Sequence, residues 1–85
     1  MRIIPTARFE REYKKLSNSL KDKAELAMEI FKNDPTDARL RVHKLKGRFC
    51  NYWAFTVDYD CRIIFRYGNS DEIFLILIGN HDIYK

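Results

Sequence analysis

The last five residues of the chain contain side chains that could transfer protons. His81, Tyr84 and Lys85 supply an imidazole, a phenol and an ammonium, and they closely follow the apolar run Leu75–Ile78. Because an imidazole titrates near neutral pH, His81 can serve as a general acid or base when a rigid strand holds it in place. The sequence therefore predicts an acid/base site at this end of the chain.

A second group of candidates lies in the basic segment between residues 43 and 48. The segment reads His-Lys-Leu-Lys-Gly-Arg, so it holds a second histidine, His43, and three cations, Lys44, Lys46 and Arg48. Gly47 would allow the backbone to approach a phosphate closely. A solvated basic loop would have the same composition, so the motif alone leaves both interpretations open.

A third group lies on one predicted strand. Asp60 precedes Arg62, and an Arg on a strand is held rigidly enough to bind a phosphate through two parallel hydrogen bonds. Arg66 shares the polar face of this strand with Arg62. The alternative role of Arg62 is a salt bridge to Asp58, Asp60 or Glu72.

Metal chemistry is a weaker interpretation of the same residues. His43 and His81 could bind a metal ion together with Asp60, but the chain shows no short spacing of His or Cys ligands. We therefore expect neither a metal ion nor another cofactor at this site.

Two helices are predicted to precede these residues. A short strand from Arg2 is closed by Pro5, Thr6 caps the first helix, and a capping pair of Ser19 and Asp22 starts the second. Apolar residues at helical spacing mark the face that each helix buries: Phe9, Tyr13 and Leu16 in the first, and Leu20, Ala24, Ala27, Met28 and Phe31 in the second. Each helix is short, so we expect both to pack as a hairpin on another element.

Three β-rich runs in the second half supply that element. They are Tyr52–Val57, Arg62–Tyr67 and Ile73–Ile78, and short polar connections between them favour antiparallel pairing. Alternation predicts that Trp53 and Phe55 face the core. We predict a single α+β domain over residues 1–85 with the order β-α-α-β-β-β, in which the N-terminal helical hairpin packs on one face of a twisted, mainly antiparallel four-stranded sheet.

Composition narrows the function further. The 85 residues suffice for one core but not for separate cofactor and substrate domains. The net charge of +4 favours nucleic acid, an anionic membrane surface or an acidic protein as partner. The first 20 residues contain no signal-like apolar run, and no run is long enough to span a bilayer. We expect a cytoplasmic protein without a membrane partner, in which Cys50 and Cys61 are reduced packing residues.

The order of elements and three motifs together resemble the RelE/ParE superfamily of toxins from type II toxin-antitoxin systems. The motifs are Lys44–Gly47 before a Trp-containing strand, Asp60–Phe65, and the closing Ile-Gly-Asn-His-Asp-Ile-Tyr, and the resemblance covers essentially the whole chain. It implies the RelE-like microbial RNase fold and a cytoplasmic toxin that a cognate acidic antitoxin neutralises. RelE-like members cut mRNA on the ribosome, whereas ParE-like members inhibit DNA gyrase.

The resemblance also implies roles for single residues. The histidines of YafQ-type toxins fall on His43 and His81 and their Asp on Asp60, while the strand Arg and the terminal Tyr of RelE fall on Arg62 and Tyr84. His81 would then be the general acid, His43 or Asp60 the base, Arg62 would hold the scissile phosphate, and Tyr84 would orient the substrate. The cations expected to bind RNA are Lys44, Lys46, Arg48, Arg66 and Lys85.

Two departures from the family pattern limit this transfer. Two lysines of RelE fall on Trp53 and Phe55, and a second YafQ-type histidine falls on Thr56, which cannot act as a base. From the resemblance as a whole we expect a ribosome-dependent mRNA endonuclease that inhibits translation by metal-independent acid/base chemistry. The alternatives are a ParE-like gyrase inhibitor, which does not need His81 and Tyr84, and a binding module without activity.

Overall fold

The secondary structure follows the predicted order with three short additions. The computed structural model describes residues 1–80 of the chain. Its helices and strands are β1 (Arg2–Pro5), α1 (Ala7–Lys14), α2 (Asn18–Asn33), the 3-10 helix η1 (Ala38–Leu40), β2 (His43–Lys44), the 3-10 helix η2 (Gly47–Phe49), β3 (Trp53–Asp58), β4 (Cys61–Tyr67) and β5 (Glu72–Gly79). None of the helices among the described residues is long and apolar enough to cross a membrane.

Hydroxyl side chains fix where both α-helices begin. The Thr6 Oγ1 accepts a hydrogen bond from the Phe9 N–H and donates one to the Leu75 carbonyl oxygen at 2.8 Å, so the predicted cap also ties α1 to β5. For α2 the predicted start at Ser19 is wrong. Ser17 is the cap, and its Oγ accepts from the Leu20 N–H at 3.2 Å. Both serines precede the same apolar face, which is why the sequence alone did not distinguish them.

The sheet has the order β1-β5-β4-β3-β2. Strand β1 runs parallel to β5, and the pairs β3-β4 and β4-β5 are antiparallel, as predicted. The expected number of four strands is too low, because His43 and Lys44 pair with Ala54 and Trp53 and form a fifth strand in what we predicted to be a loop. Two residues are too few to show the alternation that reveals a strand in a sequence.

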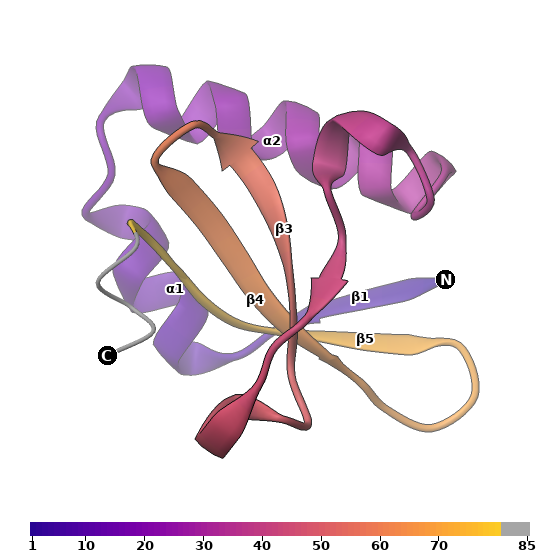
Figure 1. The fold of residues 1–85 in the computed structure, drawn as a ribbon. Coiled ribbons are helices and arrows are strands. Elements are labelled where there is room, and N and C mark those ends of the chain that lie inside the picture. The colour runs from indigo at the N-terminus through magenta and orange to yellow at the C-terminus, as the bar shows by residue number, and fades with distance from the viewer. Residues whose placement is uncertain (81–85) are drawn as a thin grey trace.

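Both helices pack on one face of the sheet, which confirms the predicted α+β architecture. Helix α1 lies beside β5, and α2 crosses β3 (Figure 1). The ring of Phe31 on α2 is completely buried, with its centroid 4.7 Å from that of Phe55 and 4.9 Å from that of Phe65. Trp53 and Val57 pack against the same core, so the predicted facing of β3 is confirmed.

Polar contacts of Tyr13 join the two helices. The Tyr13 hydroxyl on α1 donates to the Glu25 carboxylate on α2 at 2.7 Å, and the Lys21 ammonium lies 5.9 Å from the centre of the Tyr13 ring. The hydrogen bond to the Glu25 carboxylate is the main reason why the pKa of Tyr13 rises to about 12. The helical hairpin is thus held together at its surface as well as through the core.

The opposite face of the sheet carries a smaller apolar cluster. Ala54, Ile64 and Leu77 are buried there, and Leu45 and Tyr52, from the segment around η2, pack against them. Gly47, at the start of η2, has a φ of 68°, a left-handed conformation that glycine adopts without strain. The segment between β2 and β3 therefore covers the middle of this face, and polar residues occupy the end where β3 meets β4.

The Phe31 cluster should dominate stability. We expect Phe31→Ala to lower the free energy of unfolding by about 3–5 kcal/mol, because the cavity it leaves is walled by the rings of Phe55 and Phe65. Leu26→Ala on the same helix is the control, since Leu26 is 63% exposed and its truncation should cost less than about 0.5 kcal/mol. Urea unfolding followed by circular dichroism measures both, and equal midpoints for the two variants would contradict this account of the core.

Candidate functional site

Arg62 lies where β4 begins, on the face of the sheet opposite the helices. The strand register places it between Thr56 on β3 and Gly79 on β5. Its guanidinium donates to two backbone carbonyl oxygens, those of Asp58 at 2.7 Å and Cys61 at 3.2 Å. Within residues 1–80 no carboxylate forms an ion pair with it, so the alternative role as a salt-bridge partner is wrong. Its charge therefore remains available to an anion.

His43 shares this face with Arg62. It lies opposite Ala54, which makes it a diagonal neighbour of Thr56 at a Cα separation of about 7–8 Å. Its Nδ1 is 2.9 Å from the Arg41 carbonyl oxygen. A carbonyl oxygen only accepts hydrogen bonds, so Nδ1 carries the proton, and in the neutral ring the lone pair is on Nε2. The hydrogen bond to Arg41 thus occupies Nδ1 and leaves Nε2 of the exposed imidazole as the proton acceptor.

A basic pocket of about 420 Å³ surrounds Arg62 at the edge of β3. Its lining residues are Arg39, Arg41, Thr56, Val57, Asp58, Tyr59 and Arg62. The pocket exists because β2 pairs with only the first two residues of β3 and leaves the rest of that edge without a neighbouring strand. Sequence reasoning missed Arg39 and Arg41, because nothing in their local pattern indicates that they come next to Arg62.

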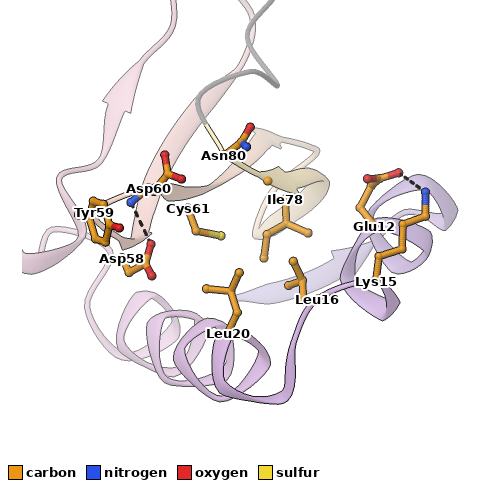
Figure 2. A pocket seen from close by; sticks show the side chains of 11 residues that line it. Glu12, Lys15, Leu16, Leu20, Asp58, Tyr59, Asp60, Cys61, Ile78 and Asn80 are labelled. Atoms are coloured by element: carbon orange, nitrogen blue, oxygen red, sulfur yellow. Dashed lines mark hydrogen bonds and ion pairs between the residues drawn. The ribbon is translucent and has the colours of Figure 1, made fainter.

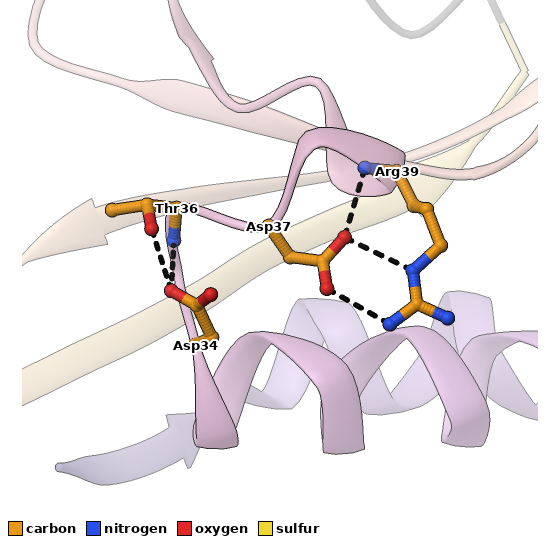
Figure 3. Close-up of polar contacts among 4 residues, drawn as sticks. All are labelled: Asp34, Thr36, Asp37 and Arg39. Atoms are coloured by element: carbon orange, nitrogen blue, oxygen red, sulfur yellow. Dashed lines mark hydrogen bonds and ion pairs between the residues drawn. The ribbon is translucent and has the colours of Figure 1, made fainter.

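The two missed arginines differ in their surroundings. Arg39 is paired with Asp37 through two hydrogen bonds, from Nε at 3.0 Å and from Nη2 at 2.8 Å (Figure 3). This guanidinium is the main reason why the pKa of Asp37 falls to about 2. Arg41 ends η1 with a φ of 50° and is exposed, and no described side chain pairs with its guanidinium.

Asp60 lines a different pocket from Arg62. It lies in the turn between β3 and β4, where its backbone N–H donates to the Asp58 carboxylate at 2.9 Å. Its neighbours around this second pocket, of about 480 Å³, come from the helices, the start of β4 and the end of β5, and they include Glu12, Cys61 and Asn80 (Figure 2). The two pockets share Asp58 and Tyr59, so they are neighbours, and the action of Asp60 and Arg62 on one phosphate stays a prediction.

The other predicted cations within residues 1–80 do not line the pocket around Arg62. Arg66 is four residues further along β4, about 13 Å away, and its guanidinium lies 4.4 Å from the centre of the Phe74 ring. Lys44 is paired with Trp53, so its register places it on the helix side of the sheet. Lys46 precedes η2, and Arg48 lies over the ring of Phe49.

Three predicted site residues, His81, Tyr84 and Lys85, lie outside the described residues. His81 directly follows Asn80, which lines the pocket of Asp60. In the part of the chain from residue 1 to 80, no three His, Cys, Asp or Glu side chains lie close enough together to bind a metal ion.

The two cysteines have different environments, and both are free thiols. Cys61 is buried in the main core, as expected, whereas Cys50 is exposed, so its predicted role as a packing residue is wrong. Burial, with a contribution from the nearby Asp58 carboxylate, raises the pKa of the Cys61 thiol to about 11. Cys61 lines the pocket of Figure 2 but is a poor nucleophile there.

Comparison with known proteins gives a consistent assignment. A family model described as the bacterial toxin of type II toxin-antitoxin systems, YafQ, matches residues 1–84. No curated protein sequence matches the chain significantly.

Solved structures show the same fold. YafQ from E. coli strain BL21(DE3) superposes with a TM-score of 0.80 at 19% identity, covering 99% of this chain and 98% of that chain. The YoeB/ParE toxin from Agrobacterium tumefaciens gives a TM-score of 0.78 at 19% identity, covering 95% and 99%. The E. coli DinJ-YafQ toxin-antitoxin complex gives a TM-score of 0.76 at 19% identity, covering 95% and 92%.

The reactivity of the two thiols tests the described environments of Cys50 and Cys61. At pH 8 we expect Cys50 to react rapidly with Ellman's reagent and Cys61 to react at least about a hundredfold more slowly, because burial and a raised pKa both suppress its thiolate. Cys50→Ser should abolish the rapid reaction, and unfolding in guanidinium should release the second thiol. Two equally rapid thiols in the folded protein would contradict the structure.

Proposed function

This chain belongs to the YafQ family of toxins from type II toxin-antitoxin systems, and from this membership we propose that it is an endoribonuclease that cleaves mRNA on the ribosome. The observation that carries the proposal is the arrangement of Arg62 and His43 on one face of the sheet. Arg62 is a cation without a carboxylate partner among the described residues, and His43 is an imidazole whose Nε2 is free to take a proton. Metal-independent RNA cleavage needs a base to take the 2′-hydroxyl proton and a cation to stabilise the phosphorane.

The proposed reaction is a transesterification within the RNA strand. The ribose 2′-hydroxyl loses its proton to a base and attacks the adjacent phosphorus in line, the bond to the 5′ oxygen breaks, and an acid protonates that oxygen as it leaves. The products are a 2′,3′-cyclic phosphate and a 5′-hydroxyl end. The negative charge that builds up on the phosphorane oxygens is stabilised by the Arg62 guanidinium.

His43 is the better candidate for the base. The contact between Nδ1 and the Arg41 carbonyl oxygen supports this choice, because it fixes the tautomer in which Nε2 accepts a proton. Asp60 stays the alternative base. The turn before Arg62 is shaped by the Asp58 carboxylate, which accepts a hydrogen bond from the Asp60 backbone N–H at 2.9 Å. His81 remains the proposed acid and Tyr84 the residue that orients the substrate, both on the family resemblance.

We further propose that a cognate acidic antitoxin neutralises this toxin in the cytoplasm. Support comes from the solved DinJ-YafQ complex, in which a related toxin is bound to its antitoxin, and from the net charge of +4 on this chain. Surface cations and an acidic partner attract each other over about a Debye length, which accelerates association.

Cleavage assays with purified ribosomes and a defined message test the roles of these residues. We expect His43→Ala and His81→Ala each to reduce the rate by about 10²–10⁴-fold, the usual value of one general acid or base. Arg62→Ala should reduce it by about 10²–10³-fold through lost stabilisation of the phosphorane. Arg2→Ala is the control. Arg2 lies on β1, at the opposite edge of the sheet, and pairs with Glu72 there.

Three results would revise this assignment. If Asp60→Ala is inactive while His43→Ala cleaves normally, Asp60 is the base. If His81→Ala cleaves as well as the parent, the acid is another group. If the parent leaves mRNA intact but inhibits DNA supercoiling by gyrase, the protein is a gyrase inhibitor and the endonuclease proposal is wrong.

A further inference from the structure

A third pocket lies at the same edge of the sheet, on the side of the helices. It has a volume of about 480 Å³ and is lined by Pro35, Thr36, Asp37, Ala38, Arg41, Val42, Trp53 and Tyr67. The proposed reaction at Arg62 does not use it. Because Arg41 lines both this pocket and the basic pocket around Arg62, the two are neighbours.

Aromatic rings form one wall of this pocket. Trp53 and Tyr67 meet edge to face, with ring centroids 5.6 Å apart and an angle of 83° between the ring planes. Tyr67 is 53% exposed, although it lies at the end of a buried strand. The exposed Tyr67 ring and the half-buried Trp53 ring lie beside a cation, and aromatic rings in such surroundings are the usual surface on which single-stranded RNA stacks its bases.

Hydrogen bonds hold the opposite wall, and its acidic groups already have partners. Thr36 donates to the Asp34 carboxylate through its backbone N–H at 3.0 Å and its hydroxyl at 2.6 Å, and Asp37 is held by Arg39 (Figure 3). The charge of Asp37 is thus balanced by Arg39. The unpaired charge at this pocket is that of Arg41, so the pocket favours an anionic ligand over a cationic one.

Arg41 connects the two pockets at some conformational cost. A φ of 50° is unfavourable for a residue with a Cβ, and glycine or asparagine is more common where a helix ends in this way. The left-handed backbone also ends the pairing of β2 with β3, which opens the basic pocket beside Thr56. An apolar side chain from a protein partner would cover the rings of Trp53 and Tyr67. It would also remove water from the Arg41 guanidinium without supplying an anion, which is unfavourable.

We propose that this pocket is a nucleobase subsite, in which Trp53 and Tyr67 stack a base of the RNA next to the cleaved bond and Arg41 binds the phosphate between the two pockets. The inference rests on the proposed function, because it assumes that RNA lies on Arg62. It assigns an RNA contact to three residues outside the acid/base machinery.

The only tryptophan of the chain makes the subsite directly observable. We would titrate the protein with a 2′-O-methyl RNA hexanucleotide, which cannot be cleaved because its 2′-oxygen is blocked, and follow Trp53 fluorescence. Saturable quenching is expected, and inorganic phosphate at the same concentrations should not produce it, since it has no base to stack. Tyr67→Ala should weaken binding about tenfold or more.

Arg41→Gly separates binding from folding. Glycine accepts the positive φ at this position, so this variant should unfold at the same urea concentration as the parent or a higher one. It should bind the hexanucleotide about tenfold more weakly and lower the slope of log K against log salt by about 0.7, the value for one phosphate contact on a single strand. Arg41→Lys should retain most of the affinity, and Arg2→Ala is the charge-matched control at the other edge of the sheet.

The outcomes distinguish this inference from the proposed function. If the parent cleaves mRNA on ribosomes but the hexanucleotide leaves Trp53 fluorescence unchanged, the subsite is wrong and the endonuclease stands. The subsite is also wrong if Arg2→Ala weakens binding as much as Arg41→Gly, or if inorganic phosphate quenches equally. If the parent shows neither cleavage nor quenching, the proposed function itself is wrong.

Discussion

The contact of Phe31 with Phe55 and Phe65 determines which side chains of the sheet are available for chemistry. It fixes Phe55 toward the helices, and because successive strand residues point to opposite faces, Thr56 must point away from them. The ladder between β3 and β4 then carries this choice to Arg62, the partner of Thr56. A shift of one residue in β3 would bury Thr56 and expose Phe55, removing the polar end of the open face.

The shortness of β2 is the second constraint on the site. Strand β2 begins only at His43, two residues after Arg41, whose left-handed backbone ends η1 outside the ladder. The edge of β3 beyond Ala54 therefore has no neighbouring strand, and a bare edge usually invites pairing with another chain. Here arginines at positions 39, 41 and 62 surround that edge. Their positive charge disfavours the addition of a strand from another chain.

The order of elements, the Thr6 cap and the facing of β3 were predictable, because each rests on a periodicity or on one capping residue. The residues that decide the site were harder to predict. Arg41 and Arg62 line one pocket because Arg41 has a positive φ and β2 is only two residues long. Neither feature leaves a pattern in the sequence. Asp60 and Arg62 are two residues apart, yet they line different pockets, because one lies in a turn and the other on the open face.

The ion pairs among the described residues leave two arginines at the edge of β3 without a carboxylate partner. Several of the acidic groups are neutralised where they lie, Asp37 by Arg39, Glu72 by Arg2 and Asp71 by the N-terminal ammonium. Arg62 donates only to carbonyl oxygens, and Arg41 pairs with no described carboxylate. These two guanidinium groups at the edge of β3 are therefore available to an anion such as an RNA phosphate.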